Sequence, residues 1–302
     1  MVKILSALFL LTLAPFVAAP ATAQGYTFTM IDFPGAGNTR TLGLNDSNES
    51  VGGYGMAGQQ HGYILSGGVF QTVEPPGSAF ARARSINNAH IIVGWYQQTP
   101  DDVSHGFAFD GTTYFTLDHP DGVGGTYVYG INDLNQIVGG YVDADGNEHG
   151  VAVLEDGGMP VPIDCPGATN TQPFMINNVG QIVGACDTGR PDGSIGFIYD
   201  VSTSTFTFYD FPGAVNTAFF GINDNGLLVG SYDDNTLVTH GFTYDGTTSN
   251  TLDFPGAPNS AVRAVNSTGS VVGIYYQADG SNIRGFKADL SGAAPARQDH
   301  NR

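Results

Sequence analysis

A phrase of about 45 residues recurs six times along this chain, and this repetition limits what the chain can fold into. Its clearest position is an asparagine that follows an aliphatic residue, and successive copies are 42, 45, 45, 46 and 43 residues apart. A near-constant period of this size is typical of proteins in which each copy forms one supersecondary unit. The six anchor asparagines are Asn45, Asn87, Asn132, Asn177, Asn223 and Asn266.

Each repeat is expected to contain four short strands. In the fifth repeat one strand ends at Ile222, and the Asn-Asp-Asn-Gly run after it is a tight-turn signal that folds the next strand, 227–232, back on it. A third strand begins at His240, and a fourth ends in a phrase whose proline cannot donate to a ladder hydrogen bond. Four antiparallel strands in about 40–50 residues are the unit of a β-propeller blade.

The two ends of the repeat region predict how the ring closes. The region begins with a lone fourth strand, 26–32, and ends with a third strand, 284–290, that has no fourth strand after it. The first strand can complete the last blade, whereas an open solenoid would leave strand edges exposed. We therefore expect an all-β fold, a six-bladed β-propeller of four-stranded antiparallel blades, with the ring closed by the N-terminal strand. A β-solenoid or another grouping of blades is the alternative.

The N-terminus has the pattern of a secretory signal peptide. Lys3 supplies the positive charge, residues 4–19 the apolar core and residues 21–23 a cleavage site of the A-x-A type. The apolar run contains Pro15 and is short for a membrane-spanning helix. The mature protein is therefore expected to be secreted, extracellular or periplasmic, without a membrane anchor. The expected divisions are a signal peptide at 1–23, a six-repeat β-propeller at 24–290 and a disordered tail at 291–302.

The charge balance excludes some partners. The formal net charge is −18, with 10 Lys and Arg against 28 Asp and Glu. Binding to nucleic acid or to an anionic membrane surface needs a basic patch, which this composition argues against. Solubility and resistance to self-association explain the negative charge, and we expect a monomer.

Both cysteines replace aromatic residues in the same repeat. Cys165 stands where Phe33 and Phe211 stand in other repeats, and Cys186 stands where Tyr54 and Tyr232 stand. If those aromatic residues touch one another, the two cysteines can form a disulfide, which an exported chain permits. Closing a loop of about 20 residues would contribute about 3 kcal/mol. Two unrelated free thiols are the alternative.

Arginines in the first strand of the repeats are the main departures from the repeat pattern. That strand borders the axis of a propeller, and ring closure places the last, first and second repeats side by side, with the tyrosines of the third repeat next to them. Arginine binds carboxylate, sulfate or phosphate through paired hydrogen bonds. We therefore predict a pocket for an anionic saccharide at the channel mouth; pairing of the arginines with acidic residues of neighbouring blades is the alternative. The predicted ligand-binding residues are Arg40, Arg82, Arg84, Arg263, Tyr127 and Tyr129.

Four repeats carry a histidine at the start of the third strand, and the repetition favours a structural role in holding a neighbouring turn. A ring of metal ligands is the alternative. Calcium takes oxygen ligands, so the anchor asparagines or the acidic loop 143–148 are alternative calcium sites, although asparagine commonly stabilises turns. We expect no cofactor, with calcium as the alternative. His90 and His119 lie outside the phrase, without an identifiable partner. The four repeated histidines are His61, His105, His149 and His240.

Catalytic motifs are not found in the sequence. It has no nucleophile elbow, zinc-protease helix, P-loop or dinucleotide fingerprint. A glycosidase needs two carboxylates across the scissile bond, and no pair is singled out among 24 Asp and 4 Glu. The catalytic residues, and whether the protein is an enzyme, therefore stay open.

The repeat phrases resemble those of the bacterial extracellular HAF-repeat family. His105-Gly106-Phe107 and His240-Gly241-Phe242 carry the phrase that names the family, with glycine in place of alanine. The Gly-Ile-Asn-Asp and Asp-Phe-Pro-Gly-Ala phrases extend the resemblance over residues 26–290. The resemblance implies an exported repeat protein, and it implies neither an agreed reaction nor a set of catalytic residues.

Three functions follow from these patterns. The first is an exported propeller that binds a ligand or an extracellular protein, with an anionic saccharide at the arginine-rich mouth. The second is a lyase or hydrolase that acts on an acidic polysaccharide at the same place. The third is a structural or envelope-associated interaction protein without a small-molecule site.

Overall fold

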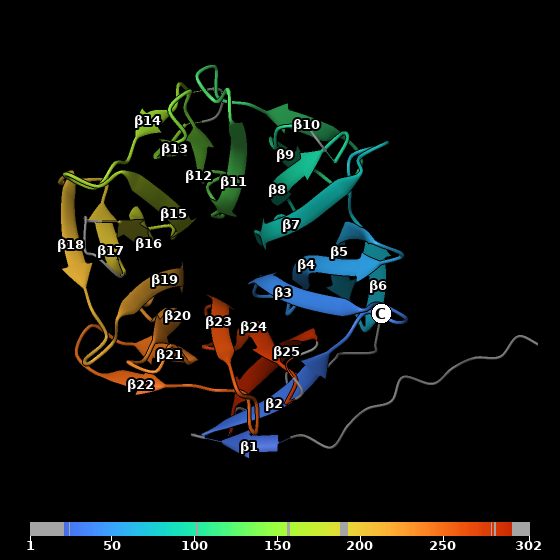
Figure 1. Cartoon of the computed structure of the whole chain (residues 1–302), viewed down its shortest axis with the longest axis vertical. Coiled ribbons are helices and arrows are strands. Elements are labelled where there is room, and N and C mark those ends of the chain that lie inside the picture. The colour runs from blue at the N-terminus through green and yellow to red at the C-terminus, as the bar shows by residue number, and fades with distance from the viewer. Residues whose placement is uncertain are drawn as a thin grey trace, which may run out of the picture.

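The computed structural model describes residues 21–23, 25–100, 102–155, 158–187, 193–278, 280 and 282–291. All regular elements of this part of the chain are β-strands, numbered β1 to β25. The strands form antiparallel sheets that are arranged around a common axis, with the first strand of each repeat innermost (Figure 1). The expected all-β architecture is therefore confirmed.

Three of the sheets contain four consecutive antiparallel strands each, as the repeat pattern predicts. The first strand of each carries a register shift just before the anchor asparagine, for example between Val128 and Gly130. The three sheets are β11 (Gly125–Ile131), β12 (Ile137–Val142), β13 (Glu148–Val153) and β14 (Val161–Pro162); β15 (Asn170–Ile176), β16 (Gln181–Asp187), β17 (Ser194–Asp200) and β18 (Thr205–Tyr209); and β19 (Asn216–Ile222), β20 (Leu228–Asp233), β21 (Thr239–Tyr244) and β22 (Ser249–Thr251).

The first two repeats form one sheet of eight strands. Its halves have the same four-strand order as the other repeats, and the parallel pairing of Gln60 with Phe80 joins them. The strands are β3 (Asn38–Leu44), β4 (Ser50–Met56), β5 (Gln59–Ser66) and β6 (Val69–Thr72), followed by β7 (Phe80–Ile86), β8 (Ile92–Gln97), β9 (His105–Phe109) and β10 (Tyr114–Leu117).

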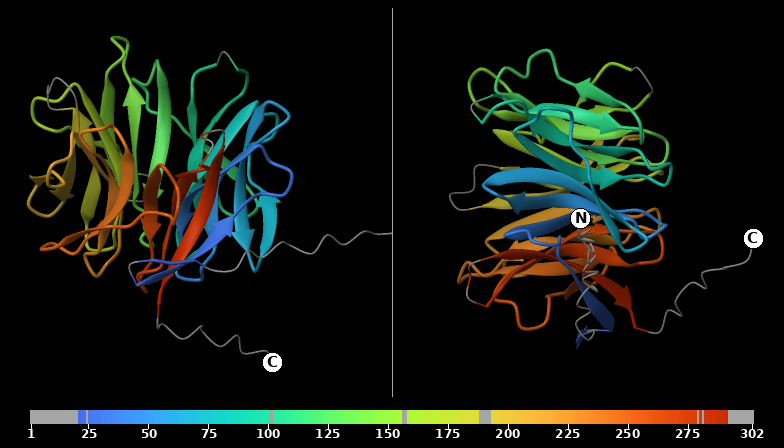
Figure 2. Two further views of the ribbon diagram at one scale, coloured as in Figure 1. Left: turned by 60° about the horizontal axis from the view of Figure 1, so that its bottom comes forward. Right: turned by 90° about the vertical axis from the view of Figure 1, so that its right-hand side faces the viewer.

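The fifth sheet joins the two ends of the repeat region. Strand β2 pairs antiparallel with β25, so that Tyr26 lies opposite Leu290 and Ile31 opposite Gly285. Both views of Figure 2 show this N-terminal strand beside the C-terminal one. Of the segment expected to be a signal peptide, residues 1–20 lie outside the described residues, as do residues 292–302 of the expected tail. The sheet is β1 (Ala21–Ala23), β2 (Tyr26–Ile31), β25 (Ile283–Leu290), β24 (Val271–Tyr276) and β23 (Ser260–Val265).

The anchor asparagines connect neighbouring repeats near the axis. Each is buried, and its Oδ1 accepts a hydrogen bond from the backbone four residues later, which fixes the turn after the first strand. Each Nδ2 donates to the backbone carbonyl of the anchor in the next repeat, and Asn266 donates back to Asn45. Fixing the turn needs a hydrogen-bond acceptor and reaching the next repeat needs a donor, and the short asparagine side chain supplies both. Asparagine at these positions is therefore explained by structure.

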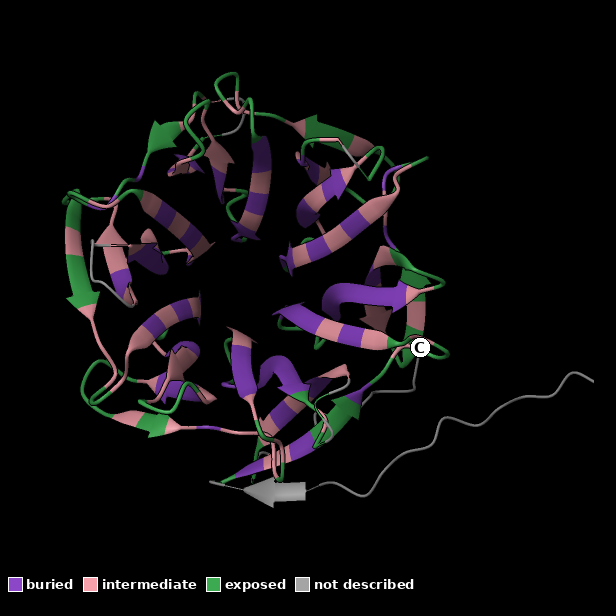
Figure 3. Cartoon of the chain, in the orientation of Figure 1, coloured by how far each residue is buried: buried purple, intermediate pink, exposed green. Residues whose placement is uncertain are grey.

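The core lies between neighbouring sheets, where the third strand contributes one fully buried aromatic ring in five of the six repeats. A glycine of the second strand faces each ring, and a Cβ on Gly94 would lie 2.9 Å from the ring of Phe107. Burial of one such ring contributes about 2–3 kcal/mol. Figure 3 shows the buried residues mainly on the strands nearer the axis, whereas the outermost strands are largely exposed. The third repeat has Val151 instead. The five buried rings belong to Tyr63, Phe107, Phe197, Phe242 and Phe286.

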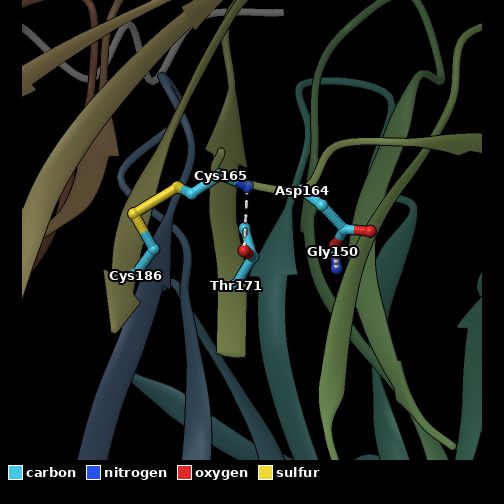
Figure 4. The surroundings of a disulfide bond; sticks show 5 residues. All are labelled: Gly150, Asp164, Cys165, Thr171 and Cys186. Carbon is cyan, nitrogen blue, oxygen red and sulfur yellow. Dashed lines mark hydrogen bonds between the residues drawn. A yellow bond between two sulfur atoms is a disulfide. The ribbon is translucent and has the colours of Figure 1, made fainter. Parts of the chain in front are cut away.

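The predicted disulfide is confirmed. Cys165 and Cys186 are bonded, with their Cα atoms 6.4 Å apart and each residue 2% exposed. The backbone N–H of Cys165 donates to the hydroxyl of Thr171, which fixes the turn that carries the cysteine (Figure 4). In three other repeats the same two positions hold stacked rings with centroids 3.6–3.8 Å apart, so the bond replaces an aromatic contact. The stacked pairs are Phe33–Tyr54, Phe211–Tyr232 and Phe254–Tyr275.

Candidate functional site

Four of the six predicted ligand-binding residues come from two neighbouring strands, and the six form two layers along the axis. The inner layer is formed by one residue from the first strand of every repeat, the one two positions before the end of that strand. Its six side chains border a shared cavity of only about 20 Å³, which is close to the volume that one water molecule needs. They therefore fill the axis instead of lining an open channel at this level. The inner layer consists of Leu42, Arg84, Tyr129, Phe174, Phe220 and Arg263.

Aromatic rings hold the inner-layer arginines. The guanidinium carbon of Arg84 lies 5.2 Å from the ring centre of Tyr129 and 5.7 Å from that of Phe174. The guanidinium carbon of Arg263 lies 3.9 Å from the ring centre of Phe220. Cations attract the electron-rich faces of such rings, and more strongly where water is excluded. This stacking places both cations in the layer without a carboxylate partner.

The outer layer is formed by the residue four positions before the end of the first strand in every repeat. Its members include Arg40, Arg82, Tyr127 and Gln172. The guanidinium carbon of Arg82 lies 5.3 Å from the ring centre of Phe80 and 5.3 Å from that of Trp95. Both arginines of this layer are half-buried. Arg82 therefore has accessible surface beside two planar rings, neither of which belongs to a predicted ligand-binding residue.

Trp95 lies between a predicted arginine, Arg82, and a predicted tyrosine, Tyr127. Its ring makes an edge contact with Tyr127, with centroids 5.3 Å apart, while its face meets Arg82. Tyr127 in turn lies parallel to Tyr129 at 6.1 Å. Trp95 was not among the predicted site residues, although it is the single tryptophan of the chain and stands where the first and third repeats have Gly53 and Gly140.

The arginines lie close to one another without acidic partners. In the part of the chain that the structure describes, none of the four makes an ion pair with a carboxylate, whereas Arg284 pairs with Asp32 at 3.2 Å. The Nε atoms of Arg82, Arg84 and Arg263 are buried without a hydrogen-bond partner among the described residues. The expected alternative, in which these arginines pair with acidic residues of neighbouring blades, is therefore not observed.

Burial and mutual repulsion disfavour the charged form of these side chains. Burial, with nearby Arg40 and Arg84, lowers the pKa of Arg82 to about 9. Burial, with Arg84 and Arg82 close by, lowers the pKa of Arg263 to about 9. Burial also lowers the pKa of Arg84 and of Arg40. Arginine side chains stay cationic at neutral pH in proteins, so the site carries positive charge, which the nearby carboxylate of Glu148 stabilises at Arg84.

Glu148 is the acidic residue nearest to this system, and it is already bound. Its Oε1 accepts a hydrogen bond from the hydroxyl of Tyr129 at 2.6 Å, and its Oε2 accepts one from Nε2 of Gln172 at 2.6 Å. Burial, followed by the charge of Glu148, raises the pKa of Tyr129 well above its usual value. Tyr129 therefore serves the packing of the inner layer, while Tyr127 is the tyrosine placed beside the outer arginines.

A larger cavity lies at the fourth and fifth repeats, next to the disulfide. Its volume is about 340 Å³, and Glu148, Gln172, Phe174 and Cys186 are among the residues that line it. This volume is at the lower end of the range of small-molecule sites. Among the described residues that line this cavity, none is one of the six predicted ligand-binding residues, so it is separate from the surface beside Arg40 and Arg82.

The repeated histidines hold turns, as their repetition predicts. Each Nδ1 pairs with a carboxylate thirteen or fifteen residues later, at 2.7–3.2 Å. Each ring also packs against the tyrosine of the second strand, as His240 does against Tyr232. Among the described residues, no group of three or more His, Cys, Asp or Glu side chains is arranged to hold a metal ion. The four pairs are His61–Glu74, His105–Asp118, His149–Asp164 and His240–Asp253.

The two histidines outside the phrase have partners that the sequence did not reveal. Nδ1 of His90 lies 2.7 Å from Oε2 of Glu49, in the preceding repeat. The ring of His119 stacks on Tyr141 at 3.9 Å, in the place of the phenylalanine of other repeats. Both are explained by packing between neighbouring elements.

Comparison with known proteins supports the fold. No family model matches the chain, and no curated protein matches it. Solved structures do: TolB from Acinetobacter baumannii aligns at 12% identity, a TM-score of 0.58, 83% of this chain and 63% of that chain. A mutant of the Aleuria aurantia lectin in complex with Fucα1-6GlcNAc aligns at 11% identity, a TM-score of 0.52, 86% of this chain and 98% of that chain. The chain is a β-propeller.

A third propeller of similar extent is a triple arginine-to-alanine mutant of AofleA from Arthrobotrys oligospora. It aligns at 10% identity and a TM-score of 0.52, over 84% of this chain and 84% of that chain. Identities this low show the fold alone, because one fold supports many functions. Among the described residues no helix is both long and apolar enough to cross a membrane. The disulfide indicates an oxidising compartment outside the cytoplasm.

Proposed function

We propose that this propeller is an exported saccharide-binding protein that holds an anionic saccharide at the outer layer of the axis. The observation that supports this most directly is the set of buried arginine Nε atoms without hydrogen-bond partners. Buried charge that lacks a partner is costly for a protein. A carboxylate, sulfate or phosphate group of a ligand would offset this charge by pairing with the accessible parts of the Arg40 and Arg82 guanidinium groups, which are half-buried in the outer layer.

The aromatic residues favour a saccharide over an inorganic anion. Trp95 and Tyr127 lie next to the guanidinium of Arg82, and the ring of Phe80 stacks on Trp95 with centroids 4.6 Å apart. A sugar ring can lie, through its C–H groups, on a ring face that these neighbours leave open. In this proposal Arg40 and Arg82 contact the anionic group, while Arg84 and Arg263 add positive potential from the layer below. One propeller of similar fold supports the class of ligand, since the Aleuria aurantia lectin was solved with Fucα1-6GlcNAc and with α-methyl-L-fucoside.

The proposal includes a closed ring of six blades. The eight-stranded sheet divides into two blades at the single Gln60–Phe80 pairing. The asparagine connections run through six anchors and return to the first, and strand β2 completes the sheet of β23 to β25. With this closure the sixth, first and second blades are neighbours, which places their four arginines together. We further propose that the chain belongs with exported HAF-repeat proteins, on the strength of its repeated phrases.

The test is retention of the mature protein on immobilised polygalacturonate, heparin and dextran, at two salt concentrations. We expect retention on at least one anionic polymer and none on dextran, with loss of retention in the Arg40→Ala, Arg82→Ala double variant. Lys287→Gln is the matched control, because it removes a cation that pairs with Asp289 on strand β25. Equal retention of the double variant and the wild type would overturn the proposal.

The same experiment examines the enzymatic alternative. After incubation, new reducing ends or unsaturated products in the polygalacturonate or heparin samples would indicate hydrolysis or elimination. Retention without products would support binding alone. Absence of retention on every anionic polymer would favour a structural or envelope-associated role with a protein partner.

A further inference from the structure

The third repeat lacks the ring that fills the core in the other five. Val151 pairs with Gly139 in the β12–β13 ladder, as Phe107 pairs with Gly94 in the β8–β9 ladder. The positions are therefore equivalent in register. Phe107 is fully buried, whereas Val151 is half-buried.

The space of the missing ring is empty. At the five other facing glycines, a Cβ would meet a ring atom at 2.6–2.9 Å, but at Gly139 the nearest atoms are backbone atoms of Tyr127 and Val128. A cavity of about 290 Å³ lies here, and both Val151 and Gly139 line it. One absent ring explains where the cavity lies, and the short strand β14, of only two residues, leaves more room beside it. The cavity reaches nearly the size of small-molecule sites.

The lining determines which ligand fits. Its walls are mainly apolar, from Leu117, Val128, Ile137 and Val153, and these side chains suit a flat ring. The polar residues that line the cavity include Asp118, His119, Asn135 and Glu155. The carboxylate of Asp118 is also paired with Nδ1 of His105 at 2.8 Å. Carboxylates accept hydrogen bonds from hydroxyl or ammonium groups and repel anions, and the net charge of −18 adds to that repulsion.

We propose that this cavity is a second binding site, for a small neutral or cationic ligand that carries one aromatic ring. The ring would occupy the position of the Phe107 side chain in the neighbouring blade, and the polar end of the ligand would face Asp118 or Glu155. This site takes the opposite ligand charge from the arginine layers, and it does not depend on the saccharide proposal. Tyr127 borders both sites, since it lines the cavity and contacts Trp95.

The experiment compares three ligands of one ring size, namely benzylamine, phenol and benzoate, by calorimetric titration and thermal shift of the mature protein. We expect saturable binding of benzylamine and phenol to the wild type, and at least about tenfold weaker binding of benzoate. Val151→Phe should restore the ring of the other repeats, raise Tm and lower the affinity for benzylamine at least about tenfold.

Two further variants keep the test decisive. Val161→Phe makes the same substitution on β14, outside the lining and at a site 41% exposed, and should bind benzylamine as the wild type does. If Val151→Phe does not fold, Ile137→Phe fills the cavity from another strand and should block binding in the same way. Lack of saturable binding by all three ligands to the wild type would overturn the proposal, as would undiminished binding by the filled variant.

Discussion

The guanidinium of Arg263 lies directly on the face of Phe220, with 3.9 Å between the guanidinium carbon and the ring centre. This contact stabilises a cation in a place where burial and the neighbouring arginines disfavour it, as its lowered pKa of about 9 indicates. The contact therefore offsets only part of the cost of the buried charge. Proteins commonly retain such costly groups where binding needs them.

Replacement of this arginine should separate stability from binding. In Arg263→Met the side-chain stem still packs on Phe220, while the repulsion from Arg82 and Arg84 disappears. We expect the free energy of unfolding at pH 7 to rise by on the order of 1 kcal/mol, and the retention on the anionic polymer to weaken. Urea unfolding and polymer retention measure the two effects. A loss of stability equal to that of Arg263→Ala would mean that the charge itself stabilises the fold.

A stacked aromatic pair, as found in other repeats, should stabilise the fold in place of the disulfide. Removal of the bond in Cys165→Ser, Cys186→Ser is expected to cost about 3 kcal/mol, because the bond closes a loop over a sequence separation of 21 residues. In Cys165→Phe, Cys186→Tyr the rings should stack as Phe211 and Tyr232 do, at 3.7 Å.

Thermal unfolding with and without dithiothreitol separates these cases. We expect the reductant to lower the Tm of the wild type and to leave that of the aromatic double variant unchanged. The aromatic variant should also be more stable than the serine variant. Equal Tm values for the two variants would show that the rings of other repeats contribute little at this position.

The periodicity of the sequence was sufficient to predict the strands, and the equivalence of repeat positions was sufficient to predict the disulfide. Alignment of the repeats places Cys165 and Cys186 on a pair of positions, and the contact between Phe33 and Tyr54 shows why that pair is close. The same equivalence of repeat positions predicts that Arg84 and Tyr129 lie in one layer, and their side chains are in contact. Repeat equivalence predicts proximity well because each sheet repeats the same backbone.

The sequence could not predict which side chains a given layer leaves accessible. Tyr129, and not Tyr127, is a packing residue because its hydroxyl binds Glu148. Glu148 comes from a different strand, and only the fold sets its position. The cavity at Val151 was likewise hidden, although the substitution of valine for an aromatic residue at this position is visible in the repeat alignment. A departure from the repeat pattern shows at which position one repeat differs from the others. Whether that difference creates a cavity depends on the neighbouring side chains, which the sequence does not place.

The anchor asparagines should be sensitive to truncation. Asn177→Ala removes the donor to the carbonyl of Asn223 and the acceptor for the backbone N–H of Gln181, in a place that is 3% exposed. Buried backbone groups that lose their partners cost about 1–3 kcal/mol, and we expect a loss of this size in urea unfolding. Asn250→Ala, on the outer strand β22, is the control and should change the free energy of unfolding little. A loss below about 0.5 kcal/mol in Asn177→Ala would mean that water replaces both partners.

The histidine contacts should make stability depend on pH. The hydrogen bond to Asp143 is the main cause that raises the pKa of His149, and Asp164 adds to it against the opposing effect of burial. Because the folded pKa is above the ordinary value near 6.5, this stabilisation is fully present below pH 6.5 and is lost as the pH rises through the folded pKa. The hydrogen bond from His149 also holds the pKa of Asp143 well below its usual range, so that carboxylate stays charged throughout.

The Tm of the wild type and of His149→Gln, measured between pH 5.5 and 8.5, tests this dependence. We expect the wild type to exceed the variant most at pH 5.5 and least at pH 8.5. Asp145→Asn is the control, since it removes a carboxylate from the same loop while both partners of His149 stay in place. It should follow the pH dependence of the wild type. A constant difference between the wild type and His149→Gln across this range would show that the imidazole contributes only as a neutral hydrogen-bonding group.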